Sequence, residues 1–148
     1  MEVAKEKQEK FVYTLRQIRP KPNHYKANCF NSNKDIVGCI WFELQKNKVW
    51  LHKIAVKANY RRYESNGIKH HIGSHLLAIM ENFAKENNIY LVEGKFYPSA
   101  EGVRNFYEKN GYHVPNKTQD WATYDETWTL YKTLDRATKT SLTQEKTK

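Results

Sequence analysis

The segment IAVKANYRRYESNGIKHHIGSHLLAIMENFAK, from Ile54 to Lys85, decides how the rest of the chain is interpreted. It begins in an apolar strand that runs from Trp50 to Val56, continues through a basic loop that contains a glycine, and enters a helix at Gly73-Ser74. In this arrangement the free N–H groups of the helix N-terminus and the positive end of the helix dipole point into the loop. The segment therefore predicts a binding site for an anion.

Apolar spacing predicts that this helix ends at Asn87-Asn88 and that a second helix lies further along the chain. The apolar face of the first helix consists of Leu76, Leu77, Met80, Phe83 and Ala84. The second helix opens at Pro98-Ser99 and ends at Asn110-Gly111, where the glycine supplies a left-handed C-cap position.

Alternation and apolar runs predict strands in the remaining segments. Turn chemistry at residues 31–35 and at Asn47-Lys48 separates three of them, and residues 115–120 read as a loop. The predicted strands are Phe11 to Ile18, Tyr25 to Asn31, Ile36 to Leu44, Val49 to Val56, Ile89 to Gly94, Tyr112 to Val114 and Glu126 to Leu134.

This order of elements predicts an α/β fold: a mixed, mostly antiparallel sheet with a strand-helix-strand crossover in its middle. We expect one domain over residues 11–134, a flexible N-terminus over residues 1–10, and a disordered polar tail over residues 135–148. The ligand crevice should lie at the carboxyl ends of the central strands.

Composition limits the partners that this chain is suited to. The formal net charge of +9 over 148 residues makes a polyanionic partner plausible, whether a nucleic acid, a membrane surface or a phosphate-rich cofactor. No apolar run reaches the length of a membrane span, and the charged first residues do not resemble a signal peptide, so we expect a cytoplasmic protein. Cys29 and Cys39 are then expected to be thiols, and not a disulfide.

Three segments resemble the GNAT superfamily of acyl-CoA N-acyltransferases: LHKIAV, IGSHLLAIMENFAKE and NFYEKNGY. The last is the most specific of the three, and the resemblance extends over roughly Ile36 to Leu134. The family's phosphate-binding loop has the pattern Arg/Gln-x-x-Gly-x-Gly/Ala, of which the last glycine corresponds to Gly73. The first glycine then corresponds to His71, and an insertion over roughly Tyr63 to Lys69 is the simplest account of the difference.

The first part of the chain also departs from the family. One or two helices usually follow the first strand and shape the acceptor pocket. Here Gln17 to Tyr25 contains two prolines and leaves little room for them. The resemblance therefore says least about the acceptor.

The resemblance implies an acetyl-CoA-dependent N-acetyltransferase, in which an amine attacks the thioester directly. Acetyl-CoA would bind with its pyrophosphate on the loop and helix N-terminus, and with its thioester between two splayed strands. A backbone N–H near Ala55 or Val56 would stabilise the charge that develops on the carbonyl oxygen. The implied coenzyme-binding residues are Ile54, Ala55, Val56, Arg61, Arg62, His71, Ile72, Gly73, Ser74 and Asn105.

Two proton transfers need side chains. By resemblance, Tyr107 of NFYEKNGY would protonate the leaving thiolate, and the alternative for it is a core tyrosine on a helix face. Histidine has an unperturbed pKa near ~6.5, which suits His52 as the base. Glu43 on the neighbouring strand is the rival base, and for both residues the alternative is a polar residue on a solvated strand face. His52 is expected to point away from Leu51 and Lys53.

Other features allow further hypotheses. The spacing of His71 and His75 suggests zinc, but no cysteine or acidic cluster completes a site, so we predict no metal. Trp121, Tyr124 and Trp128 could line an acceptor site, the core or a dimer interface.

Three classes of function remain open. The first is a GNAT enzyme that acts on a small amine or on a protein amino group, and it could be a homodimer. The second is a non-catalytic GNAT-like domain that binds acyl-CoA or a partner. The third, a nucleic-acid-binding module, is disfavoured because lysines and arginines are scattered along the chain and do not form one stripe.

Overall fold

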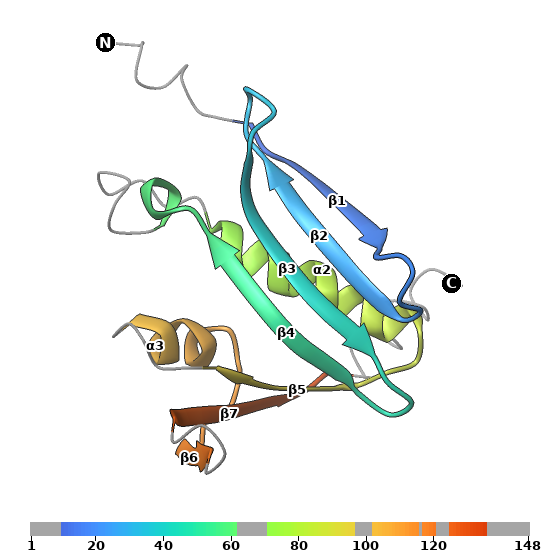
Figure 1. Ribbon diagram of the computed structural model, residues 1–148, viewed down its shortest axis with the longest axis vertical. Coiled ribbons are helices and arrows are strands. Elements are labelled where there is room, and N and C mark those ends of the chain that lie inside the picture. The colour runs from blue at the N-terminus through green and yellow to red at the C-terminus, as the bar shows by residue number, and fades with distance from the viewer. Residues whose placement is uncertain (1–9, 62–70, 97–101, 116, 121–124, 136–148) are drawn as a thin grey trace, which may run out of the picture.

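The computed structural model describes residues 10–61, 71–96, 102–115, 117–120 and 125–135, and within them the strands form one seven-stranded sheet (Figure 1). The sheet has the order β1-β2-β3-β4-β5-β7-β6, and every neighbouring pair is antiparallel except β4–β5. The predicted mixed, mostly antiparallel sheet is therefore confirmed. The strands are β1 (Val12–Gln17), β2 (His24–Phe30), β3 (Ile36–Leu44), β4 (Val49–Val56), β5 (Leu91–Phe96), β6 (Lys117–Asp120) and β7 (Asp125–Thr133).

Helix α2 (Ile72–Glu86) forms the crossover between the parallel strands β4 and β5, as predicted. Its apolar face packs on the sheet: Leu76, Met80 and Ala84 are completely buried, and Phe83 is half-buried against the core. A one-turn helix, η1 (Ala58–Tyr60), follows β4, and α3 (Gly102–Lys109) follows β5. The predicted start of the second helix, at Pro98-Ser99, lies outside the described residues.

Strands β4 and β5 are paired over a short length only. The register joins Val49 to Val92 and Leu51 to Gly94, and no pair is present beyond Leu51 in the described residues, although β4 continues to Val56. Figure 1 shows the two strands diverging from there. Among the described residues, part of the β4 backbone edge is therefore left without a strand partner, in the middle of the sheet.

A bulge in β4 accompanies this divergence. Trp41 is opposite Lys53, whereas the next residue of β3 is opposite Leu51, so His52 is the extra residue. The expectation that His52 and Lys53 point to opposite faces is wrong, because a bulge interrupts the alternation of side chains. Trp41 stacks on His52 and is the register partner of Lys53, so both lie on the face of Trp41.

The two faces of the β1–β4 part of the sheet differ. Figure 1 looks onto the face opposite α2, and no described helix covers it. The cause lies in the chain between β1 and β2, which turns within six residues and forms no helix, as the prolines predict. This face is therefore open in the described part of this chain.

Two predictions near the C-terminus are wrong in detail. Residues 115–120, predicted as a loop, include strand β6, whose Lys117 is opposite Trp128. The predicted strand from Tyr112 to Val114 is reduced to one bridge between His113 and Tyr131. Both differences arise because pairing with β7, and not local propensity, decides these segments.

Cys29 is buried and Cys39 is half-buried, and within the described residues neither forms a disulfide. Among the described residues, no helix has the length and apolar character needed to cross a membrane.

Candidate active site

The N-terminus of α2 presents backbone amides with no partner inside the helix. The first helical bond runs from the N–H of His75 to the carbonyl oxygen of His71, so the N–H groups of residues 72–74 point out of the helix end. His71 is the N-cap, has φ of 57°, and makes no capping bond with its side chain. This left-handed conformation favours glycine, the residue that the resemblance leads us to expect there. His71 therefore adopts a backbone conformation that is less favourable for a histidine than for a glycine.

Gly73 contributes close packing. A Cβ atom built on it would lie 2.8 Å from the Phe106 ring, so α3 packs directly against the first turn of α2. Any larger residue at this position must displace Phe106, which precedes Tyr107 in α3. The glycine therefore links the helix N-terminus to the helix that carries the predicted acid.

The free edge of β4 offers specific amides. Lys57 donates its N–H to Val37 of β3, at 2.9 Å. Because successive residues of a strand direct their amides to opposite edges, Val56 and Ile54 direct theirs away from β3, toward the diverging β5. Ala55, the other predicted donor, directs its amide toward β3. The carbonyl oxygen of Val56 on the same edge accepts a 2.8 Å bond from Nε of Arg61.

Tyr107 lies in an aromatic cluster on α3. Its ring centroid is 4.9 Å from that of Phe96 and 5.9 Å from that of Tyr112, and the residue is 4% exposed. Burial raises the pKa of its phenol to about 12. The hydroxyl is therefore protonated throughout the neutral range, which is the form that a proton donor requires.

His52 and Glu43 lie together on the open face of the sheet. Nε2 of His52 is 3.1 Å from Oε1 of Glu43. The hydrogen bond from His52 is the largest of the effects that hold the pKa of Glu43 below its ordinary value. Glu43 is thus an ionised acceptor, Nε2 of His52 donates to it, and Nδ1 carries the lone pair of the neutral imidazole.

Two residues that the sequence did not point to complete this cluster. Trp41 donates its indole N–H to Nδ1 of His24 at 3.1 Å, and Nε2 of His24 lies 3.5 Å from Oε1 of Glu43. An indole N–H only donates, so Nδ1 of His24 accepts and the proton of the neutral ring is on Nε2, facing Glu43. Glu43 is therefore hydrogen-bonded to His52 and faces Nε2 of His24, whose tautomer Trp41 fixes.

This cluster also has the composition of a metal site, since ligand atoms of His24, Glu43 and His52 lie within 4.8 Å of one another. The hydrogen bonds argue against that use. A metal on Nε2 of His24 would move its proton to Nδ1, where it would face the indole N–H of Trp41. Of the two histidines with zinc-like spacing, His71 and His75, the second has Nδ1 3.1 Å from the hydroxyl of Tyr13.

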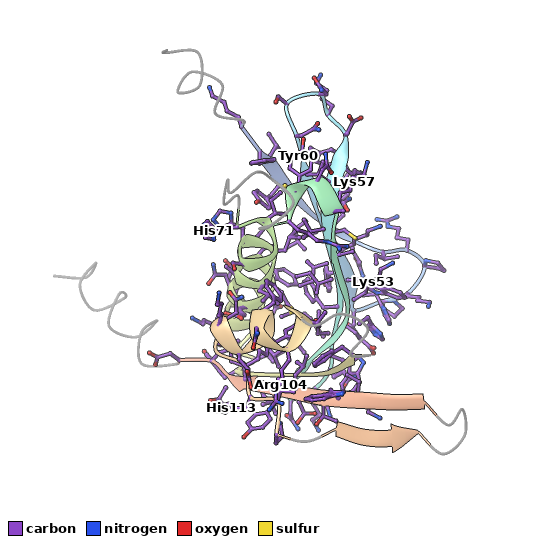
Figure 2. All side chains as sticks on the ribbon, turned by 90° about the vertical axis from the view of Figure 1, so that its left-hand side faces the viewer. Lys53, Lys57, Tyr60, His71, Arg104 and His113 are labelled. Carbon is purple, nitrogen blue, oxygen red and sulfur yellow. The ribbon has the colours of Figure 1, made fainter. Side chains whose placement is uncertain are left out.

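The predicted acid and base come from opposite sides of the sheet. Phe106 contacts Gly73, so α3 lies on the α2 side, whereas His52 lies on the open side. Both are associated with the strands that diverge, His52 through β4 and Tyr107 through its contact with Phe96 of β5. Figure 2 shows the sheet edge-on, with His71 on the helix side and Lys53 on the other.

The remaining residues predicted from the sequence for the coenzyme or acceptor site are on α3, near β5, or outside the described ranges. Asn105 is exposed on α3, and Trp128 packs near Phe96 with Arg104 stacked 4.8 Å above its ring. Arg62, Trp121 and Tyr124 lie outside the described residues.

Comparison with known proteins supports the family. Residues 26–114 match the family model described as an acetyltransferase (GNAT) domain, which is more than half of the chain. No curated protein matches the chain significantly.

Many solved structures share the fold. One is a Bacillus anthracis str. Ames protein, described as a streptothricin acetyltransferase and solved with acetyl coenzyme A. It has 22% identity and a TM-score of 0.64, over 78% of this chain and 65% of that protein. A GNAT family acetyltransferase from Elizabethkingia anophelis with acetyl-CoA bound has 14% identity and a TM-score of 0.66, over 84% of this chain and 98% of that protein. The ribosomal-protein-S18-alanine N-acetyltransferase from Escherichia coli has 10% identity and a TM-score of 0.65, over 84% of this chain and 95% of that protein.

Proposed function

Because the chain belongs to the GNAT acetyltransferase family, we propose that it moves an acetyl group from acetyl-CoA to a primary amine by direct attack. The observation that carries this proposal is the pairing of His52 with Glu43 on one side of the diverging strands and the buried hydroxyl of Tyr107 on the other. A thioester between β4 and β5 would then have a base on its open side and an acid on its helix side.

Acetyl-CoA would bind along the β4 edge and the start of α2. The amides of Ile72, Gly73 and Ser74 point out of the helix and suit the pyrophosphate, with the helix dipole favouring its charge. Arg61, which bonds to Val56, would add positive charge beside them. The N–H of Val56 is the better-directed candidate for the carbonyl oxygen, since the amide of Ala55 faces β3.

The proposed reaction balances without a metal. The ammonium of the acceptor gives one proton to Nδ1 of His52, and the free amine attacks the carbonyl carbon. As the C–S bond breaks and the amide forms, the nitrogen releases its second proton to water. The thiolate that leaves takes the proton of Tyr107. The two proton transfers use separate residues, so the enzyme returns to its starting state by exchange with water.

The acid step is uphill at equilibrium. The pKa of Tyr107 is about 12 and that of a thiol in water about 8.5, a difference of about 3.5 units or ~5 kcal/mol. The unshifted tyrosine pKa of ~10 would give only ~2 kcal/mol. A buried site also raises the pKa of the thiol, which narrows the gap, and a penalty of this size remains small beside a chemical barrier.

Glu43 fits a supporting role better than the role of base. Its lowered pKa makes it a weak proton acceptor at neutral pH. As a carboxylate it holds the proton of His52 on Nε2, leaves Nδ1 free, and stabilises the imidazolium that forms during the reaction.

The test is a screen of primary amines for thiol release from acetyl-CoA, with His52→Gln and His52→Ala beside the parent protein. The proposal predicts amine-dependent thiol release, and a loss of that release in both variants. Saturable acetyl-CoA binding without release from any amine would instead support a non-catalytic domain. Release that neither His52 variant reduces would remove this residue from the mechanism.

A further inference from the structure

The open face of the sheet carries a row of cations that the linear sequence does not show. In the strand register, Arg16 is opposite Lys26, Lys26 is opposite Trp41, and Trp41 is opposite Lys53. Directly opposed residues share a face, so these four residues form one line across β1, β2, β3 and β4. With strands about 4.8 Å apart, the line extends over roughly 14 Å. We call Arg16, Lys26 and Lys53 the cationic row.

The row lacks anionic partners. Within the described ranges, no carboxylate forms an ion pair with a member of the cationic row. All three are exposed, and Arg16 and Lys26 are opposed like charges, which destabilise a sheet. Lysines and arginines are scattered along the linear sequence, which predicts no basic stripe. For this face of the sheet that prediction is wrong, because the strand register aligns three of them. An unpaired row of this kind would be stabilised by an anion from outside.

The row lies next to the proposed base. Trp41, within the line, stacks on His52 with ring centroids 4.8 Å apart, and Lys53 follows His52 in the chain. A fourth cation joins them, since Nζ of Lys21 lies 5.6 Å from the centroid of the Trp41 ring. Figure 2 shows Lys53 on the side of the sheet away from α2. A molecule that brings an amine to His52 from the open side must therefore lie against these cations.

We propose that the acceptor is an acidic polypeptide, whose amino group reaches His52 while its carboxylates lie along the cationic row. This inference rests on the proposed function and adds the class of acceptor.

The extent of the row favours a polypeptide over a small anionic amine, because one carboxylate cannot span roughly 14 Å of cations. The two tryptophans of this face, Trp41 and Trp50, favour a polypeptide over a single-stranded nucleic acid, because their rings are already covered. Such binding depends on bases that stack on aromatic rings. Trp41 already stacks on His52 and has Lys21 over it, and Trp50 on the same face has Lys48 over its ring at 5.7 Å.

The test compares three peptides of equal length with one central lysine, flanked by aspartates, asparagines or arginines. The parent protein should acetylate the aspartate peptide with a kcat/KM about tenfold above that of the asparagine peptide, and the arginine peptide least. The preference should shrink as salt is added, because exposed charges are screened. The double variant Arg16→Gln with Lys26→Gln should lose most of the preference, whereas Lys109→Gln on α3, exposed and away from this face, should keep it.

The outcomes separate the inference from the proposed function. Equal rates for the three peptides, or a preference that survives in the double variant, would overturn the inference and leave the acetyltransferase intact. If no peptide is acetylated, calorimetric binding decides. Salt-sensitive binding of the aspartate peptide that the double variant loses and Lys109→Gln keeps supports the acidic partner, and equal binding of all three peptides overturns it. Tighter binding of a short single-stranded DNA to the same row would overturn it in favour of a nucleic acid.

Discussion

Replacing Tyr107 with phenylalanine removes one oxygen atom and should separate catalysis from folding. The ring would keep its contacts with Phe96 and Tyr112, at centroid distances of 4.9 Å and 5.9 Å. We therefore expect the free energy of unfolding to change by no more than about 1 kcal/mol, a shift in Tm of roughly 2–4 °C. General acids contribute about 10²- to 10⁴-fold to rates. Since donation from a phenol with a pKa of about 12 is uphill, we expect the lower end, a fall in kcat of about 10²-fold.

The assay is thiol release at saturating acetyl-CoA and amine, with the acetyl-CoA Kd measured separately. The Kd should change less than about twofold, because a transition-state interaction is lost and not a binding one. Tyr112→Phe is the matched control: it lies in the same cluster, but its hydroxyl donates to Glu81 at 2.7 Å, so kcat should stay near that of the parent. An unchanged kcat in Tyr107→Phe, or an equal fall in both variants, would refute the acid role.

The pH dependence gives an independent check on the same residue. Tyr107 acts in its protonated form, and with a pKa raised to about 12 it stays protonated as the pH rises through 10. The parent protein should therefore show no alkaline loss of kcat from this group up to about pH 10. A loss centred near pH 10 that disappears in Tyr107→Phe would contradict the raised pKa.

Three further variants test other parts of the site. Glu43→Gln should lower kcat/KM about 10- to 100-fold at neutral pH with little change in the acetyl-CoA Kd, because His52 loses the carboxylate that orients it. An unchanged kcat/KM would contradict this. His71→Gly should raise the free energy of unfolding by about 0.5–1 kcal/mol in denaturant titrations, because φ of 57° strains a histidine and not a glycine. A lower denaturation midpoint would mean that the histidine side chain makes a stabilising contact. Gly73→Ala should weaken acetyl-CoA binding measured by calorimetry and destabilise the fold by about 1–3 kcal/mol, because the new Cβ would lie 2.8 Å from the Phe106 ring. Unchanged acetyl-CoA affinity and unchanged stability would mean that α3 adjusts freely.

Segments whose structure depends on local pattern were predictable. The helix read from Leu76, Met80 and Ala84 begins and ends within about one residue of its predicted limits, because a 3.6-residue period and the closing asparagines are local signals. The hairpin between β3 and β4 has its predicted limits, since a short polar turn fixes both strands.

Features that depend on the register between strands were missed. His24 lay just outside the predicted second strand, although the turn at residues 31–35 would bring it opposite Glu43 in a hairpin. The bulge at His52 has no sequence signature, so the direction of Lys53 was predicted wrongly. The cationic row combines three strands, and a one-residue change of register would move any of its members to the other face.

The most direct test of the central claim is acetyl transfer itself. Purified protein, acetyl-CoA and a panel of primary amines, including the aspartate-flanked lysine peptide, are followed together by thiol release and by mass spectrometry of the amine. The account predicts release that depends on the amine, an equal amount of acetylated amine, and loss of both in Tyr107→Phe and His52→Gln. Acetyl-CoA that binds tightly but is never transferred to any amine would contradict it.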